Sequence, residues 1–433
     1  MNGFKYHTLG DTGVHKPVEV DGKFIILRKM SDIKKFTIDA IKNAQEDFEL
    51  TQNDKDHIIN ALVTKRELFH EENLLFLDEH NPPIVKDTKK VSLIFFSNKY
   101  CEITKDEIKV KPYSDLNGAI YKSQVIDFII DDSISLICSD NPSEFYEEDI
   151  ESLMSIIGYL LHTYKNPART KAVILMDEDN GINPNGRTGK TLLVQAIGKI
   201  RNTVWKDGKS FNFTNRFSLS GVDWDTQILA MDDVPKYFDF ERFFPAITSG
   251  ITVEEKFKKE YRIPPELSPK IIITTNYTVG GEGQSYKGRK IEFELSNYFN
   301  AAWGPAEKYG RLFFEDWGEQ DWQQFYLFMM TCIQIYLQNG IIESLGVNID
   351  LKRLLQEAGE DFIFFMNKNI SLNQKYDKKE IFEMYVSKFP GQAGLTQRTF
   401  TSWIKLYATF HIYTITESHS NNIEYFMLSE DKS

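Results

Sequence analysis

Residues 185–191 constrain the fold of this chain more than any other segment. They read Asn-Gly-Arg-Thr-Gly-Lys-Thr, follow the apolar run at 172–176 and precede the apolar run at 192–197. A buried strand, a glycine-rich turn ending in Gly-Lys-Thr and a helix form the context in which a phosphate-binding loop occurs. Successive backbone N–H groups of such a loop and of the helix N-terminus can bind a polyphosphate together. The segment therefore predicts an α/β core built around a phosphate-binding loop.

The residues of this loop have separate expected roles. Its two glycines permit a tight turn and a close approach of the backbone to phosphate. Lys190 is expected to reach the β- and γ-phosphates of ATP, and the Thr191 hydroxyl to bind Mg²⁺. Pro184 stands where the usual pattern has its first glycine, so an ordinary glycine-rich loop with a surface lysine is the alternative. The residues assigned to nucleotide binding are Asn185, Gly186, Arg187, Thr188, Gly189, Lys190 and Thr191.

A second apolar strand, at 227–231, ends in the acids Asp232 and Asp233. A buried strand delivers the groups at its carboxyl end to the edge of the sheet where α/β proteins bind ligands. Asp232 is expected to hold Mg²⁺ through water, because Mg²⁺ keeps much of its hydration. Asp233 is expected to orient or deprotonate the attacking water. The alternative is a strand that runs into an ordinary Asp-rich turn.

A third apolar strand, at 270–275, ends at Asn276. An amide offers donors and an acceptor, so Asn276 can bind both the attacking water and the γ-phosphate. An asparagine that merely starts a turn is the alternative.

In this order the three motifs resemble those of superfamily 3 helicases, which are AAA+ ATPases of viruses, phages and mobile elements. Residues 251–264 resemble the family's additional motif, a β-hairpin that reaches into a central pore. The resemblance implies that Lys256, Lys258 and Lys259 touch the DNA backbone, with Phe257 against a base or sugar. Residues 252–290 carry eight Lys and Arg against five Glu, the sign that phosphate contact requires. A solvated, charged hairpin is the alternative.

Arg289 lies in the region where this family places an arginine finger. The resemblance implies that its guanidinium, donated by the adjacent subunit, stabilises charge on the γ-phosphate. Arg311 is the second choice for this role. The resemblance also extends to residues 298–317 and 93–125, which look like parts of phage and poxvirus-type primase-helicases.

Three domains are expected. Residues 1–145 would form an α-rich collar, 146–345 the AAA+ helicase domain and 346–433 a winged-helix-like module. In the last of these, a helix over 396–406 would bury Phe400, Trp403 and Ile404 and would turn Arg398 and Lys405 outward. Such a helix can enter the major groove of DNA, and a role in protein contact or hexamer packing is equally compatible with the near-neutral module.

Composition limits the remaining choices. Three scattered cysteines without metal-type spacing indicate reduced thiols in the cytoplasm. No run of about eighteen apolar residues exists, so no membrane partner is expected. The net charge of −12 argues against a protein coated in nucleic acid but leaves room for a local basic channel. The first 150 residues lack a primase-type set of paired acids and histidine, so a separate primase or polymerase would be a partner.

Together these features predict an ATP hydrolase that uses Mg²⁺, and the resemblance implies a hexameric ring. By resemblance it would translocate 3′ to 5′ on single-stranded DNA and unwind forked DNA. One alternative is an AAA+ motor for DNA packaging or transposition. The other is a non-catalytic origin-binding scaffold, against which the paired Asp232 and Asp233 argue.

Overall fold

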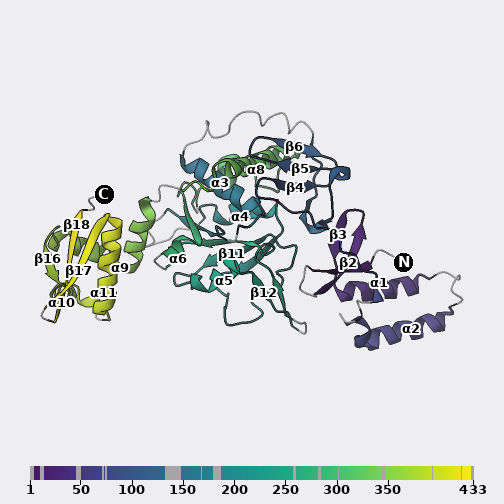
Figure 1. The fold of residues 1–433 in the computed structure, drawn as a ribbon, viewed down its shortest axis with the longest axis horizontal. Helices are drawn as coiled ribbons and strands as arrows, with labels where there is room; N and C mark the ends of the chain where they lie inside the picture. The colour runs from purple at the N-terminus through teal and green to yellow at the C-terminus, as the bar shows by residue number, and fades with distance from the viewer. Residues whose placement is uncertain are drawn as a thin grey trace.

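The computed structural model describes the chain except residues 1–3, 10–13, 45–49, 71–72, 74–75, 132–147, 167, 179–186, 257–259, 281–283, 301, 344–346, 393, 421 and 431–433. Its centre is a five-stranded parallel sheet with the strand order β10-β11-β14-β9-β15. The strands are β9 (Ala172–Asp177), β10 (Thr203–Asp207), β11 (Ile228–Val234), β14 (Lys270–Thr275) and β15 (Lys290–Leu295). Figure 1 shows this sheet between the N-terminal helices and the C-terminal module.

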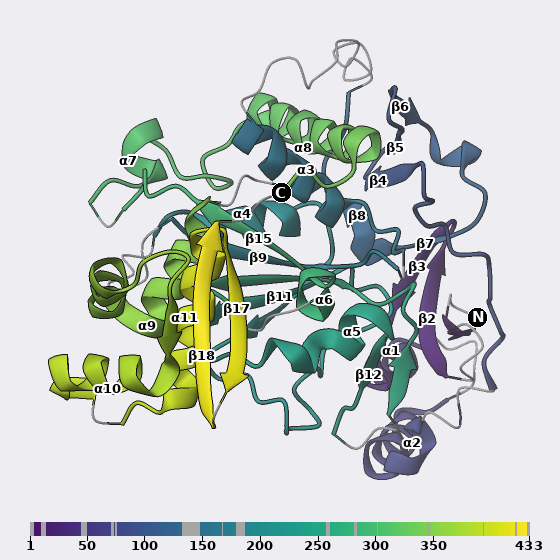
Figure 2. The same cartoon turned by 60° about the vertical axis from the view of Figure 1, so that its left-hand side comes forward.

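The strands of the sheet are near-continuous apolar runs because both faces of the sheet are covered. Successive side chains point to opposite faces. Val173 and Leu175 therefore join the core formed with α3 (Glu148–Leu161), α4 (Lys190–Gly198) and α8 (Glu319–Asn339). Ile174 and Met176 join the core on the other face. Figure 2 shows α3 and α8 side by side above the sheet.

The second face is covered by short elements that lie between β11 and β15 in the sequence. They are the 3₁₀ helix Phe240–Phe243, α5 (Phe244–Thr248), the antiparallel pair β12 (Ile251–Val253) and β13 (Tyr261–Ile263), and α6 (Gln284–Lys287). The expected hairpin between the second and third motifs is therefore present as β12 and β13. The short helix α7 (Pro305–Tyr309) precedes α8.

The strand order places the carboxyl ends of three strands, and the loops that follow them, side by side. Strand β14 pairs with both β9 and β11, and all three run in the same direction. Their carboxyl ends therefore meet at one edge of the sheet, where the loop after β9, the tip of β11 and the tip of β14 become neighbours.

The N-terminal region contains more strand than expected, so the prediction of an α-rich region for 1–145 is wrong. Two four-stranded sheets, ordered β1-β2-β3-β7 and β6-β5-β4-β8, accompany only two α-helices among its described residues. Short strands expected at 91–96 and 107–110 are present at Ser92–Phe96 and Ile108–Lys111, whereas the strands within residues 4–27 show no clear two-residue alternation and were missed. The elements are β1 (Phe4–Thr8), β2 (His15–Asp21), β3 (Phe24–Leu27), α1 (Met30–Lys42), α2 (Gln52–Thr64), β4 (Ser92–Phe96), β5 (Tyr100–Ile103), β6 (Ile108–Lys111), β7 (Ile120–Tyr121) and β8 (Val125–Ile126).

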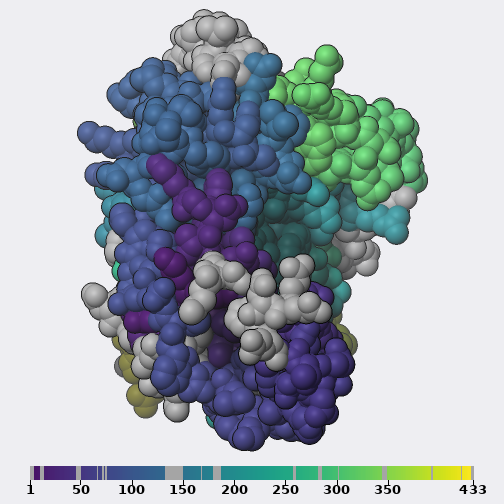
Figure 3. All heavy atoms as spheres, turned by 90° about the vertical axis from the view of Figure 1, so that its right-hand side faces the viewer, coloured from purple at the N-terminus to yellow at the C-terminus, as the bar shows by residue number. Residues whose placement is uncertain are grey.

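The second of these sheets shares its core with the domain that contains the five-stranded parallel sheet. Ile94 and Phe96 of β4 pack in the same buried cluster as Met154 of α3 and Ile333 of α8. The hydrophobic core therefore continues across the expected boundary at residue 145. Figure 3 shows the purple N-terminal strands lying against the blue segment that carries this sheet.

The C-terminal module has its own core, which runs from Leu354 to Leu428. Its elements are α9 (Val347–Asn369), β16 (Lys375–Asp377), α10 (Lys378–Lys388), α11 (Gln397–Phe410), β17 (Tyr413–Ser420) and β18 (Ile423–Glu430), with the sheet order β16-β18-β17. Gly359 interrupts α9 with a φ of 76°. None of the helices in the described part of the chain is long and apolar enough to cross a bilayer.

Candidate nucleotide-binding site

The loop after β9 leads directly into α4. Gly189 is the N-cap of α4 and has a φ of 103°, a conformation that only glycine adopts without strain. No atom lies within 4 Å of the position that a β-carbon would take there, so backbone conformation rather than space requires glycine. The helix begins at Lys190, and its first N–H groups have no partner within the helix. Asn185 and Gly186 lie outside the described residues.

The side chain of Lys190 connects the first motif, the glycine-rich loop at 185–191, to the third, the strand that ends at Asn276. Its ammonium group donates a hydrogen bond to Oδ1 of Asn276 over 2.8 Å and forms an ion pair with the carboxylate of Asp177. Asp177 is the last residue of β9 and is 1% exposed, and it also accepts a hydrogen bond from the Thr188 hydroxyl. The tips of β9 and β14 and the start of α4 therefore converge on one lysine ammonium.

Asp232 connects the second motif to the same place. The Thr191 hydroxyl lies 3.3 Å from Oδ1 of Asp232, and the Thr274 hydroxyl donates to the same oxygen over 2.7 Å. A hydroxyl and a carboxylate oxygen are the hard ligands that Mg²⁺ prefers, and Mg²⁺ needs only one or two protein carboxylates beside substrate phosphates. The donor set at Thr191 and Asp232 thus fits a magnesium ion.

Asp233 has an unusual backbone conformation, with a φ of 56°. Its N–H donates to the Thr274 hydroxyl over 2.8 Å, which holds the turn against β14. Its carboxylate lies 2.5 Å from the ammonium group of Lys209, and both side chains are substantially exposed. The hydrogen bond to Asp233 raises the pKa of Lys209. This turn leaves the carboxylate of Asp233 accessible to solvent beside Asp232.

Space for a ligand adjoins these groups. An open groove of about 1140 Å³ is lined by residues that include Thr191 and Asp232. Its lining also includes Phe314 and Trp322, whose rings lie within 6 Å of the ammonium group of Lys199. Ligand pockets in proteins commonly enclose about 300–1,000 Å³, so the groove is large enough for a nucleoside triphosphate.

Three residues of this site were not predicted from the sequence. Asp177 and Thr274 are polar residues at the ends of apolar strands, the same signal that identified Asp232 and Asn276, and could have been found by it. Lys209 follows the edge strand β10 in a turn without a motif, and only the parallel pairing of β10 with β11 brings it to Asp233.

Arg289, the first candidate for an arginine finger, lies away from this edge. Arg289 immediately precedes β15, and its carbonyl accepts a hydrogen bond from Ala172 at the start of β9. It therefore sits at the amino edge of the sheet, opposite Lys190. Its guanidinium donates to the carbonyl of Ser285 over 3.0 Å and lies over the ring of Phe244, while its buried Nε has no hydrogen-bond partner within the described ranges.

Arg311, the second candidate, is bound to an acid instead. Its guanidinium pairs with Asp321 at 2.8 Å, and this hydrogen bond raises its pKa.

The candidate DNA-contacting residues are only partly described. Lys256 is exposed just beyond β12, whereas Phe257, Lys258 and Lys259 lie outside the described residues. In the C-terminal module Arg398 and Lys405 are exposed on α11, as the sequence indicates. Lys405 forms an ion pair with Glu417 of β17 at 3.3 Å, so part of its charge is already balanced.

The same helix buries the side chains that were expected to face the module's core. Phe400, Trp403 and Ile404 are each no more than 6% exposed. They belong to the core cluster that also contains Phe362 of α9 and Phe426 of β18.

Comparison with known proteins gives distant likenesses. No family model matches the chain, and no curated protein matches it. Two apo structures of the NrS-1 C-terminal region are similar over 99% of this chain and 97% or 96% of theirs, at 12% and 11% identity and TM-scores of 0.43 and 0.41. A JCV helicase bound to a small molecule is similar over 51% of this chain and 65% of its own, at 14% identity and a TM-score of 0.25.

Likenesses this distant carry no argument about mechanism. The functional interpretation therefore depends on the geometry of the site. The mixed α/β fold has a parallel sheet, and the loop after its strand β9 leads directly into helix α4. A lysine at the start of a helix, an acid and an amide at neighbouring strand tips define a candidate nucleotide site.

Proposed function

We propose that this protein is an ATP-dependent DNA helicase of the superfamily 3 type. The observation that carries the proposal is the meeting of three sequence-distant motifs at one sheet edge. Lys190 bonds Asn276 at 2.8 Å, and Thr191 lies 3.3 Å from Asp232. A lysine, a hydroxyl, a carboxylate and an amide around one point are the groups that phosphoryl transfer needs.

Each group has a distinct task in hydrolysis. The N–H groups at the start of α4 and the Lys190 ammonium bind the phosphates, and Asn276 orients the γ-phosphate and the attacking water. Asp233 accepts the proton of that water or orients it. Thr191 and Asp232 would hold Mg²⁺, which supplies charge neutralisation for the phosphates. Catalysis by such a site is largely positioning and electrostatic stabilisation.

The position of Arg289 supports a site completed by a neighbouring copy. Arg289 lies at the amino edge of the sheet and cannot reach the nucleotide bound by Lys190 of its own chain. A second copy that presents its own Arg289 across an interface would supply the cation. A closed ring satisfies this demand for every subunit, since head-to-tail contacts close by rotation. We propose a hexamer on the basis of the family resemblance.

Coupling to DNA is assigned to the β12–β13 hairpin. The exposed Lys256 and the neighbouring lysines of the turn would bind the backbone of single-stranded DNA, independently of sequence. Movement of the hairpin during hydrolysis would draw one strand through the ring, 3′ to 5′, and separate forked DNA. The C-terminal module, with Arg398 and Lys405 exposed, would contact DNA or a neighbouring subunit.

A forked-duplex unwinding assay tests this function. Asp233→Asn should bind ATP normally, hydrolyse it at least about a hundredfold more slowly and fail to unwind. Asp239→Asn removes an exposed acid that pairs with Arg242 away from the site, and it should leave both activities unchanged. Normal turnover by Asp233→Asn would overturn the assignment of the base. ATP hydrolysis without unwinding by the wild-type protein would favour a packaging or transposition motor.

A further inference from the structure

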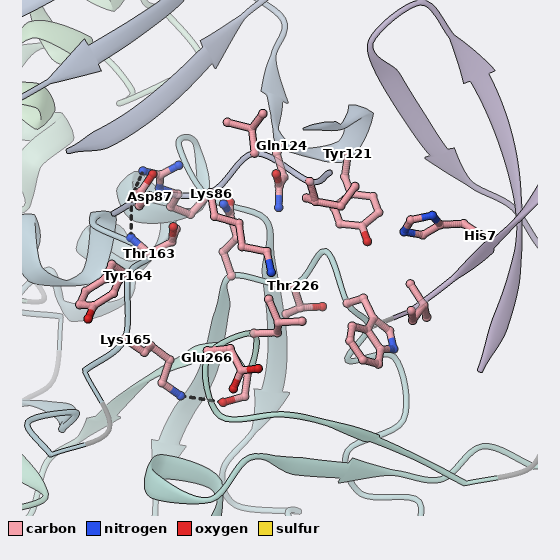
Figure 4. Close-up of a pocket in the computed structure, with 18 of the residues that line it drawn as sticks. His7, Lys86, Asp87, Tyr121, Gln124, Thr163, Tyr164, Lys165, Thr226 and Glu266 are labelled. Atoms are coloured by element: carbon pink, nitrogen blue, oxygen red, sulfur yellow. Dashed lines mark hydrogen bonds and ion pairs between the residues drawn. The ribbon is translucent and has the colours of Figure 1, made fainter. Parts of the chain in front are cut away.

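A second cavity lies at the opposite edge of the same sheet. It encloses about 630 Å³ between the N-terminal region and the ATPase core (Figure 4). The segments that line its core side precede strands: Lys165 leads to β9, Arg201 to β10, Gln227 to β11 and Ser268 to β14. Because parallel strands begin at one edge and end at the other, this cavity and the Lys190 site lie at opposite ends of the strands.

Cations predominate in the cavity wall. Lys86, Lys165 and Arg201 face two carboxylates, Asp87 and Glu266. Figure 4 shows Lys86, Lys165 and Glu266 around one space.

Two of these charged groups, Arg201 and Asp87, are held by hydrogen bonds to other parts of the protein. The buried guanidinium of Arg201 donates to the carbonyls of Leu161 and Leu93 and lies 3.6 Å from Asp87. The carboxylate of Asp87 accepts further hydrogen bonds from the backbone of Leu93 and Thr163. Lys86, Lys165 and Glu266 therefore remain as the charges available to a ligand.

Hydrogen-bond donors in the cavity lack sufficient partners. Trp224 is 6% exposed, and its buried Nε1 has no hydrogen-bond partner in the part of the chain that the structure describes. Among the described residues, Lys86 makes no hydrogen bond or ion pair within bonding distance. Lys165 donates to the Ser268 hydroxyl at 2.7 Å and only weakly to the Pro269 carbonyl at 3.4 Å. A buried donor without a partner costs about 1–3 kcal/mol, so a ligand that accepts these hydrogen bonds would be stabilised here.

The lowered pKa of Lys165 is consistent with a cation that lacks sufficient partners. Burial lowers the pKa of Lys165 to about 8, against the opposing influence of Glu266. An anion placed beside this ammonium would favour its charged form and raise the pKa again.

Aromatic side chains form another part of the wall. Tyr121, Tyr164, Trp224 and His7 line the cavity, and Figure 4 shows the amide of Gln124 near Tyr121. In the part of the chain that the structure describes, this amide makes no hydrogen bond, so its donors and acceptor are available. Flat rings and a free amide can receive a heterocyclic base, because stacking requires only a π-face and an amide matches a base edge.

We propose that this cavity binds a small phosphate-bearing molecule of mononucleotide size, with its phosphoryl group at Lys86 and Lys165 and its ring beside Tyr121 and Trp224. This site is separate from the phosphate-binding loop around Lys190. It does not depend on the proposed helicase activity, since it concerns binding at the other edge of the sheet.

Isothermal titration calorimetry on the full-length chain tests the proposal, with dAMP, inorganic phosphate and deoxyadenosine as probes. We expect dAMP to bind more tightly than either fragment. Lys86→Met should weaken dAMP binding about tenfold or more, the loss of one charge-assisted hydrogen bond. Lys89→Met, at an exposed lysine outside the cavity, is the matched control and should bind as the wild type does.

Two further variants locate the binding. Lys190→Met should leave dAMP affinity unchanged, and Lys165→Met should reduce it as Lys86→Met does. Equal affinities for Lys86→Met and Lys89→Met would overturn the proposal, as would the absence of binding by dAMP and phosphate at millimolar concentration. Loss of binding in Lys190→Met alone would assign the ligand to the phosphate-binding loop and would equally refute a second site.

Discussion

Replacement of Lys190 should lower the stability of the protein as well as abolish hydrolysis. Its ammonium group is the cationic partner of Asp177, whose side chain is 1% exposed and whose Oδ2 has no hydrogen-bond partner among the described residues. Removing one partner of a buried ion pair costs about 3–5 kcal/mol, because an uncompensated charge stays buried. The Thr188 hydroxyl still donates to Asp177 after Lys190→Met, so we expect a loss near the lower end, about 3 kcal/mol.

A second substitution separates stability from catalysis. In Asp177→Asn/Lys190→Met no charge remains to be compensated, so most of the lost stability should return. ATP hydrolysis should stay absent, because no ammonium group reaches the β- and γ-phosphates. Neighbouring residues in one ion pair are coupled, so the two single losses should not add in the double variant.

Urea denaturation without nucleotide, followed by tryptophan fluorescence, measures these changes, and release of phosphate from ATP measures hydrolysis. The wild type, the two single variants and the double variant complete a double-mutant cycle. An unchanged unfolding midpoint for Lys190→Met would refute the reasoning, because Asp177 would then not depend on the lysine. Recovery of hydrolysis in the double variant would refute the role of Lys190 itself.

Three more predictions concern other parts of the chain. Thr274→Val should lower the rate of ATP hydrolysis about tenfold, because the carboxylate of Asp232 loses a hydrogen bond and the buried N–H of Asp233 loses its acceptor. Thr275→Val, which removes a hydrogen bond to the Val234 carbonyl instead, should not lower it, and equal rates for the two variants in a steady-state assay would contradict this. Burial raises the pKa of Glu294 to about 7, above its unfolded value, so the free energy of unfolding should fall as pH rises from about 5 to 8. Urea titrations at these two pH values should show that Glu294→Gln makes this fall smaller by about 1–3 kcal/mol. Lys256→Ala should reduce stimulation of ATP hydrolysis by single-stranded DNA and lower the salt dependence of DNA binding by about one phosphate contact; an unchanged salt slope would exclude such a contact.

The central site was the part of the molecule most accessible from sequence. Apolar strands that end in polar residues mark the carboxyl edge of a parallel sheet, and Asp232 and Asn276 were predicted in this way, whereas Lys190 was predicted from the Gly-Lys-Thr sequence before a helix. Their meeting follows from the placement of β14 between β9 and β11, which sequence spacing alone does not specify. The sequence pattern thus indicated which residues lie at the carboxyl edge of the sheet. The strand order, seen only in the structure, shows that they are neighbours.

Other features depend on tertiary pairing and could not be predicted. The N-terminal hairpins are stabilised by neighbours such as β7, which lies about a hundred residues from β3 in the sequence, so local periodicity gave no signal. The contact of Lys209 with Asp233 requires the parallel pairing of β10 with β11. The second cavity combines residues from His7 to Ser268.

The C-terminal module is attached to the nucleotide site through one helix. The ammonium group of Lys352 on α9 donates to the backbone carbonyl of Asp177, and the Gln356 amide oxygen accepts from the N–H and hydroxyl of Thr278 over 2.9 and 2.8 Å. These bonds fix the first part of α9 to the tips of β9 and β14. Gly359 then breaks the helix, and the residues beyond it pack in the module's own core. Leu354 and Ala358, which precede Gly359, also belong to the module's core, so the same short segment of α9 contacts both the strand tips and the module.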